Sequence, residues 1–384
     1  TINGAVTTGG DLSVTVKDLF ETNATVLSHG AVQVEAQDVK LYADFASDKN
    51  LAMTVHNYLY AEWLKDLSSK ADATLKARVA RLDSDVRADG KLTIETDDNL
   101  STENISAGGD AVLNAGAFFG ARSVDVAGNA DIKAGRSISV LRDLNVGGDL
   151  NAQANEDIAA SNITSKGKTT LTAQTGEIRA DGSIRSDAEA VLTAKDITIG
   201  GGISAKRNAQ LTADENVTLG GKTEVGETLT AQVGKDLAAN GTIATGKDFV
   251  AHVGNDLAVN DLVSAGGNAS LTVGRNATLD GALSTGGNFT ANVGKDLTAN
   301  AAVLSYGRAT IDAQNVNLTA DLMSDKNLAI TAKNNIITKE GANLSTKADG
   351  TLKARTVGFD GDVHADGTLT IETDEQLAAK NITA

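Results

Sequence analysis

Residues 246–253 read Gly-Lys-Asp-Phe-Val-Ala-His-Val, and close variants of this phrase return at 266–273 and 286–293. Apolar and polar residues alternate within each copy, which places every second side chain on one face of a strand. Two shorter apolar runs follow before the next copy begins, for example Leu257 with Val259 and then Val263. A fixed period of about 20 residues with internal alternation predicts a solenoid built from strands.

The length of the repeat indicates the shape of one unit. Three alternating runs fit one triangular coil of a parallel β-helix, and the Gly, Asn and Asp residues between runs permit tight corners. One coil cannot bury its apolar row alone, so stability must come from stacking. No window has the apolar spacing of a long helix. We therefore predict an all-β parallel β-helix of about 19 coils, each of about 20 residues and three short strands.

The two neighbouring inward positions of each coil are expected to hold one large and one small side chain. The first position of six successive coils is Ala209, Leu229, Phe249, Ala269, Phe289 and Ala309. The second position is Leu211, Ala231, Ala251, Leu271, Ala291 and Ile311. One member of each pair is large and the other is Ala, as a narrow interior at native packing density requires.

Composition agrees with a stacked strand architecture and excludes several classes. The 384 residues include no Pro, as expected where strand N–H groups must pair with neighbouring coils. Cys is also absent, so disulfides and thiolate metal sites are excluded. The net charge of −16 argues against nucleic acid or an anionic membrane surface as partner. No apolar run is long enough for a membrane helix, so no membrane insertion is expected.

A larger duplication contains the short repeats. Residues 1–107 align without a gap with residues 278–384 at a constant offset, and about half of the positions are identical. Residues 108–277 carry the intervening coils, and no linker interrupts them. We therefore predict one continuous β-helix segment over 1–384. The first ten residues lack the pattern of a signal peptide and neither end resembles a capping repeat, so an excerpt of a longer array is expected.

One segment departs from the repeat pattern. Tyr58, Tyr60 and Trp63 lie close together, and the protein has no other Trp. They are interpreted either as an exposed aromatic platform for a sugar ring or a partner protein, or as a longer loop whose rings cover apolar surface on one face. The matching stretch of the second copy, residues 333–343, is predicted to be ordinary coil and turn.

Motifs for catalysis are missing. The four His residues are isolated, and the two Gly-Lys-Thr triplets at 167–169 and 221–223 lack the upstream Gly of a phosphate loop. Asp residues recur at corners, for example Asp236, Asp256 and Asp296, where Asx-turns explain them. The sequence therefore predicts no catalytic, cofactor-binding or metal-ligating residue, no cofactor, and a protein that is not an enzyme.

Two longer phrases carry a family resemblance. Residues 286–300 read Gly-Gly-Asn-Phe-Thr-Ala-Asn-Val-Gly-Lys-Asp-Leu-Thr-Ala-Asn, and residues 147–153 read Gly-Gly-Asp-Leu-Asn-Ala-Gln. They resemble the haemagglutinin repeats of filamentous haemagglutinin and its relatives, over essentially the whole chain. The resemblance implies a right-handed parallel β-helix, secreted to a bacterial cell surface by an outer-membrane two-partner-secretion transporter. It also implies a virulence role in adhesion to host-cell receptors or glycans, with no binding residues that map onto this chain.

Two functions remain open at this stage. The first is a structural and adhesive rod segment that extends binding elements from the cell. The alternative is the stick region of a contact-dependent growth-inhibition exoprotein that delivers a toxin. An enzyme of the pectate-lyase type is less favoured, because it would need clustered Asp, Arg and Lys beneath long loops.

Overall fold

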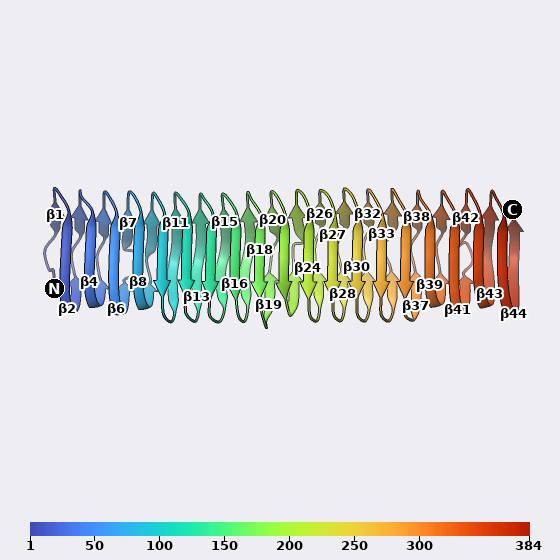
Figure 1. Ribbon diagram of the computed structural model, residues 1–384, viewed down its shortest axis with the longest axis horizontal. Coiled ribbons are helices and arrows are strands. Elements are labelled where there is room, and N and C mark those ends of the chain that lie inside the picture. Colours follow the sequence, from blue (N-terminus) through green and yellow to red (C-terminus); the bar gives the residue numbers. More distant parts are fainter. The chain divides into compact units, whose positions relative to one another are not determined.

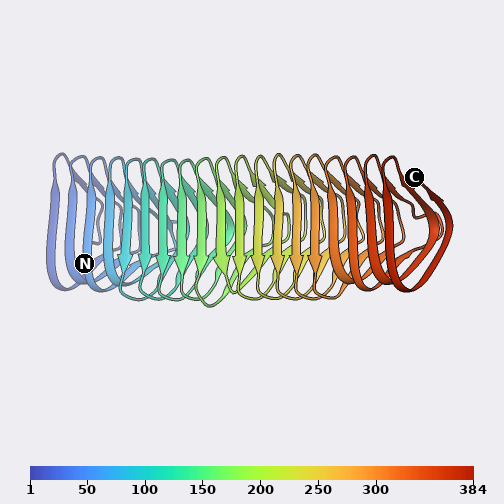
Figure 2. The same ribbon diagram turned by 45° about the vertical axis from the view of Figure 1, so that its right-hand side comes forward.

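The computed structural model describes residues 1–384, and their contacts form two compact units, Thr1–Lys195 and Asp196–Ala384. Every regular element in both units is a β-strand, and the strands pair in parallel with those of the next coil (Figures 1 and 2). The units together hold about 19 coils of about 20 residues, which confirms the predicted parallel β-solenoid. That the coils form one continuous segment stays a prediction. No helix of the kind that crosses a membrane is present.

The first coils of unit 1 merge two runs into one long strand. These long strands are β2 (Leu12–Thr22), β4 (Val32–Leu41), β6 (Leu51–Ala61) and β8 (Ala73–Leu82). The third run of these coils stays separate, as β1 (Val6–Thr8), β3 (Val26–Ser28), β5 (Phe45–Ser47), β7 (Asp66–Ser69) and β9 (Asp85–Ala88).

The remaining coils of unit 1 merge the second and third runs instead. The first runs are β10 (Leu92–Thr96), β12 (Ala111–Ala115), β14 (Ala130–Ala134), β16 (Leu150–Ala154), β18 (Thr169–Ala173) and β21 (Ala190–Ala194). The merged runs are β11 (Leu100–Ala107), β13 (Phe119–Val126), β15 (Ile138–Val146) and β17 (Ile158–Ser165). The last second and third runs are separate, as β19 (Glu177–Ala180) and β20 (Ile184–Ser186).

Unit 2 begins with the regular coils that define the repeat. First runs are β24 (Ala209–Ala213), β27 (Leu229–Val233), β30 (Phe249–Val253), β33 (Ala269–Val273) and β36 (Phe289–Val293). Second runs are β22 (Asp196–Ile199), β25 (Val217–Leu219), β28 (Leu237–Ala239), β31 (Leu257–Val259), β34 (Ala277–Leu279) and β37 (Asp296–Ala299). Third runs are β23 (Ile203–Ala205), β26 (Thr223–Val225), β29 (Ile243–Thr245), β32 (Val263–Ala265), β35 (Leu283–Thr285), β38 (Val303–Ser305), β40 (Leu322–Ser324) and β42 (Leu344–Thr346). Merged strands return as β39 (Ala309–Leu318), β41 (Leu328–Thr338), β43 (Gly350–Ala365) and β44 (Leu369–Thr383).

Three separate strands therefore do not occur in every coil, and the corner residues explain the difference. In four regular coils of unit 2 the corner after the first run begins with Gly, and a Cβ on Gly254 would lie 2.0 Å from the carbonyl oxygen of Gly234. The coils in which the first and second runs merge have no Gly there. Their backbone stays extended and accommodates the corner as a β-bulge, as between Val55 and Tyr58 in β6.

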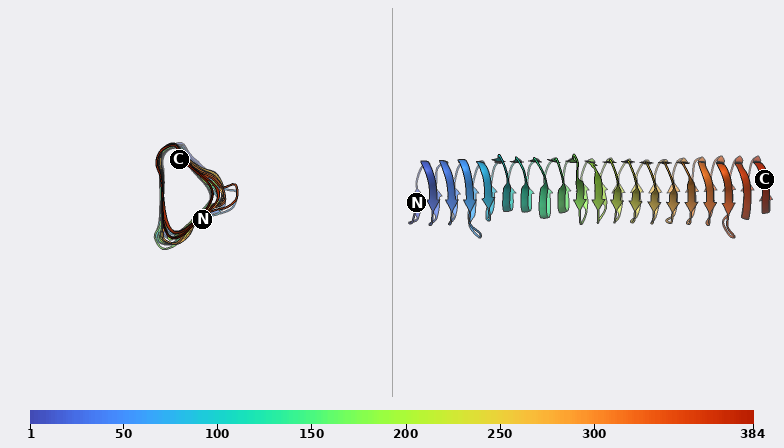
Figure 3. Two further views of the ribbon diagram at one scale, coloured as in Figure 1. Left: turned by 90° about the vertical axis from the view of Figure 1, so that its right-hand side faces the viewer. Right: turned by 90° about the horizontal axis from the view of Figure 1, so that it is seen from below.

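The inward columns are packed as predicted. Phe249 is paired with Leu229 on one side and Ala269 on the other, and all three are buried. Ala251, one inward position further along β30, is paired with Ala231 and Leu271. Each coil thus combines one large and one small inward residue, which fills the narrow triangular interior seen in Figure 3.

Corner carboxylates and amides join coils rather than closing their own turns. Oδ1 of Asp236 accepts the backbone N–H of Asp256 (3.1 Å), and Oδ1 of Asp256 accepts that of Asn276 (3.0 Å). Oδ1 of Asp296 accepts a side-chain N–H of Asn315 (2.6 Å). The prediction of Asx-turns is thus wrong at these corners, because each Asp Oδ1 accepts a hydrogen bond from an N–H group of the next coil and not of its own turn.

A column of buried hydroxyls was not expected from the sequence. Ser47 Oγ donates to the carbonyl of Gly30 (2.9 Å), and Ser305 Oγ donates to that of Gly287 (3.0 Å). These hydroxyls satisfy corner carbonyls that face the interior. The Ser or Thr that recurs as the last residue of the third run carries this signal.

Candidate functional site

The aromatic segment lies on β6, facing away from the core. Leu59 and Ala61 point inward, whereas Tyr58 and Tyr60 are half-buried on the outer face. The rings of Tyr58 and Tyr60 are stacked with centroids 6.4 Å apart, and Tyr42 of the preceding coil meets Tyr60 edge-on at 5.8 Å. Desolvation, followed by the Asp83 carboxylate, raises the pKa of Tyr60. The three phenols form a small aromatic surface on the outside of unit 1.

A four-residue loop, Glu62 to Lys65, follows β6 and carries the only Trp. The side chains of Trp63 and Leu64 are 64% and 75% exposed. Figure 3 shows loops leaving the triangular outline of the coils. The interpretation that a longer loop covers apolar surface with its rings is therefore wrong for Trp63, which projects into solvent. Whether these aromatic residues bind a partner stays a prediction.

The second copy of the duplicated block provides an internal reference for this loop. Gly341 occupies the position that Leu64 has in the first copy, and their φ angles are +79° and +60°. In residues 333–343 strand β41 continues to Thr338 and a loop equivalent to that of the first copy follows, so the two copies share this backbone. Gly adopts positive φ freely, whereas a side chain in this region costs about 1–2 kcal/mol. Leu64 is the one residue other than Gly with positive φ.

Below the loop, carboxylates occupy consecutive coils. Asp66 begins β7 and is paired with Asp85 of β9, while the Asp66 N–H donates to Asp44 Oδ1 (3.1 Å). The second copy places Asn343 at the position of Asp66. Asn343 N–H donates to Asp321 Oδ1 (2.8 Å), and Asn343 Oδ1 accepts the N–H of Asp362 (2.9 Å). The Asn keeps this backbone pattern and removes the repulsion that three successive carboxylates create in the first copy.

The electrostatics of Asp66 reflect that crowding. Partial desolvation, and then the negative charges of Asp44 and Asp85, raise the pKa of its carboxyl above the ordinary value of 3.8. Arg87 opposes this only in part and is itself paired with Asp89 at 2.9 Å. The surface around Asp66 therefore has an excess of negative charge.

A cleft of about 250 Å³ opens between the loop and the coils that follow it. Its lining includes Trp63, Asp66, Asp83, Asp85, Glu103 and Arg122. Arg81 neutralises Asp83 through two contacts of 3.0 and 2.9 Å, and Arg122 lies 3.4 Å from Glu103. Asp85 accepts only an uncharged partner, the side-chain amide of Asn104 at 2.7 Å. Asp66 and Asp85 are therefore the carboxylates of the cleft that form no ion pair, although Lys65 of the loop also lines the cleft.

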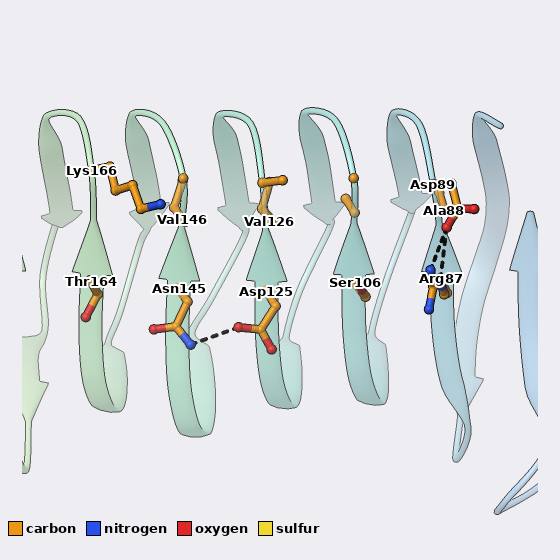
Figure 4. Close-up of a pocket in the computed structure, with 14 residues that line it drawn as sticks. Arg87, Ala88, Asp89, Ser106, Asp125, Val126, Asn145, Val146, Thr164 and Lys166 are labelled. Atoms are coloured by element: carbon orange, nitrogen blue, oxygen red, sulfur yellow. Dashed lines mark hydrogen bonds and ion pairs between the residues drawn. The ribbon is translucent and has the colours of Figure 1, made fainter. Parts of the chain in front are cut away.

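A second concave surface runs along the third runs of unit 1 (Figure 4). This groove has a volume of about 670 Å³. Its floor has one outward polar residue from each of five successive coils, namely Arg87, Ser106, Asp125, Asn145 and Thr164. Asn145 donates to Asp125 (2.8 Å) and Arg87 is paired with Asp89, so three of these five polar groups already have partners. The buried hydroxyl column is replaced beneath the groove by Ala88, Ala107, Val126 and Val146.

No group of three or more His, Asp or Glu side chains is placed to hold a metal ion. His252 is exposed on β30, as its outward phase predicts. That the chain has no catalytic, cofactor-binding or metal-ligating residue stays a prediction.

The stacked parallel coils define a β-solenoid repeat protein. The haemagglutinin repeat matches the sequence at residues 1–39, 85–139, 125–184, 147–221, 226–293, 264–337 and 305–383, so the chain belongs to the haemagglutinin repeat family. No curated relative matches it. The repeats are those of adhesin-type shafts, in a family characteristic of secreted surface adhesins. Residues 40–84, which contain the aromatic segment, lie between two matched ranges.

Sequence reasoning identified the aromatic residues but missed Leu64 and Asp66. The signal was present in the gap-free alignment of the two blocks, which pairs Trp63 with Glu340, Leu64 with Gly341 and Asp66 with Asn343. Reading it requires knowing that position 64 has positive φ and that position 66 lies between two carboxylates, and both facts come from the structure.

Proposed function

We propose that this chain is a shaft segment of a secreted bacterial surface adhesin, which extends binding elements from the cell and contributes to attachment to host cells. The supporting observation is the stacking of about 19 coils of about 20 residues over both units, in a chain that belongs to the haemagglutinin repeat family. Coils that repeat one set of backbone pairings add length at about 4.8 Å each without requiring new chemistry.

Two kinds of partner follow from this proposal. During export the chain meets an outer-membrane transporter of the two-partner-secretion type, and after export it faces host-cell receptors or glycans. The net charge of −16 disfavours nucleic acid and anionic bilayers as partners. We place the protein outside the cell or on its surface, and we assign it no enzymatic activity.

The alternative, the stick of a toxin-delivering exoprotein, uses similar repeats. No feature of the two units favours it. A nuclease or pore-forming module in the remainder of the full-length protein would support this alternative.

Removal of one coil from the full-length exoprotein tests the shaft function. Deletion of residues 247–266 joins Gly246 to Gly267 and places Asn268 where Asp248 stood, so every inward column keeps its phase. Because a shaft contributes length, bacteria that display this variant should adhere to host cells nearly as well as those with the intact protein. Lost adhesion with normal display and a folded shaft would show that coil 247–266 is itself a binding site.

A further inference from the structure

Three residues of one short segment oppose stable folding in the first copy of the duplicated block. Leu64 has positive φ where Gly341 stands in the second copy. Trp63 is exposed where the second copy has Glu340, and Asp66 is a charged residue between Asp44 and Asp85 where the second copy has Asn343. The second copy demonstrates that the fold requires none of these three choices.

The three residues also surround one space. Trp63, Leu64 and Asp66 all line the cleft of about 250 Å³ on the C-terminal side of the loop. This volume is below the range of ligand pockets for drug-sized molecules and is comparable to a single long side chain. An indole face and two un-neutralised carboxylates, Asp66 and Asp85, meet there.

We infer that this cleft receives an arginine side chain from a protein partner, held between the indole of Trp63 and the carboxylates of Asp66 and Asp85. A guanidinium group is planar, stacks on aromatic faces and donates two parallel hydrogen bonds to one carboxylate. Its positive charge would relieve the repulsion along Asp44, Asp66 and Asp85. This role goes beyond spacing, because it assigns direct contact to one coil of the shaft.

Other occupants fit less well. An anion would meet at least two uncompensated carboxylates. A sugar would gain the ring contact with Trp63 but would leave the charges of Asp66 and Asp85 without a counterpart. A lysine would neutralise charge, but it lacks the flat surface that stacks on an indole. Charge complementarity therefore selects arginine.

Trp63 itself provides the measurement, because it is the only Trp in the chain. The 384-residue protein is titrated with a capped pentapeptide that has one central arginine between small residues. We expect a saturable change in Trp63 fluorescence that weakens with added salt. The same peptide with lysine in place of the central arginine should bind more weakly. The peptide with glutamate at that position, the glutamate peptide, should not bind.

Substitutions taken from the second copy separate binding from folding. Asp66→Asn should weaken binding of the arginine peptide by about fivefold, as expected for loss of one partly exposed charge contact. The variant should remain folded. Leu64→Gly should also weaken binding, because the loop loses its side chain in the cleft and gains backbone freedom. Asp248→Asn is the matched control, since it makes the same charge change at a corner of unit 2 and should leave the affinity unchanged.

Several results would overturn the inference. One is no saturable change with the arginine peptide. A second is equal weakening by Asp66→Asn and Asp248→Asn, which would indicate attraction to the overall negative charge. A third is a saturable response to lactose or to the glutamate peptide in place of the arginine peptide, which would assign the cleft to a glycan or an anion. None of these results depends on adhesion, so they leave the shaft proposal to its own test.

Discussion

Leu64 and Gly341 occupy the same position of the same loop in two copies of one sequence block, and both have positive φ, +60° and +79°. The loop backbone is thus a property of the block, whereas the side chain at its tip differs. A strained and largely exposed Leu contributes little to packing. Strain of this kind is retained at positions where function selects the side chain.

Leu64→Gly should therefore stabilise the protein. Relief of positive-φ strain contributes about 1–2 kcal/mol, and the added freedom of Gly in the unfolded chain costs about 0.5–1 kcal/mol, which leaves a gain between about 0 and 1.5 kcal/mol. Leu141 is the control, because it is 71% exposed and does not have positive φ. Leu141→Gly should destabilise. Urea unfolding, with amide hydrogen exchange of residues 51–88 as the local readout, measures both, and destabilisation by Leu64→Gly would show that the Leu side chain supports the fold.

Asp66→Asn should change how stability depends on pH. Because the pKa of Asp66 is raised in the folded protein, its stabilising contribution is complete below 3.8, the ordinary value, and is lost as pH rises through the folded pKa. The Asn variant has no carboxyl at this position and therefore does not lose this stability as the pH rises. Its stability relative to the native protein should be similar at pH 3 and should become higher towards pH 7.

Salt provides a second test of the same repulsion. The advantage of Asp66→Asn at pH 7 should decrease at 1 M salt, where exposed charges are screened within about 3 Å. Asp248→Asn, with the uncharged Asn268 in the next coil, should give a smaller advantage at low salt. Equal behaviour of the two variants in thermal unfolding would mean that the three carboxylates do not interact appreciably.

The matching of a large side chain at position 249 with a small one at position 251 can be tested by a double-mutant cycle. Phe249→Ala should leave a cavity and cost about 3–5 kcal/mol, and Ala251→Leu alone should overpack the interior at about 1–3 kcal/mol. Together the two changes should cost less than their sum, because the new Leu occupies part of the cavity. Strict additivity in chemical unfolding would refute the exchange of volume between these columns.

The fold could be predicted in outline because its main determinant is one-dimensional. Inward positions such as Phe249 and Ala251 recur at a fixed spacing, and stacking converts that spacing directly into buried columns. Strand merging at Val55 and Tyr58 was not predictable in the same way, since a Gly-free corner can form a turn or a bulge. The hydrogen bond from the Asn276 N–H to Asp256 Oδ1 was missed for a related reason. It joins residues 20 positions apart, whereas turn rules consider only residues that are close in sequence.

The candidate site was only partly predictable. Trp63, Tyr58 and Tyr60 stood out by composition, but composition does not reveal whether a ring is covered or exposed. The importance of Leu64 depends on the sign of one φ angle, and that of Asp66 depends on the carboxylates of the two neighbouring coils. Both become visible only when residues about 20 positions apart are placed side by side.

The stacking of interchangeable coils is tested most directly by comparing two deletions in the regular part of unit 2. Removal of residues 247–266 deletes one whole coil, whereas removal of residues 247–256 deletes half a coil and brings inward columns against corners. Limited proteolysis read by mass spectrometry should leave the whole-coil variant as resistant as the native protein, and cleavage of the half-coil variant should concentrate at the junction. Equal resistance of the two variants, or rapid cleavage of the whole-coil variant at its junction, would contradict the stacked-coil account.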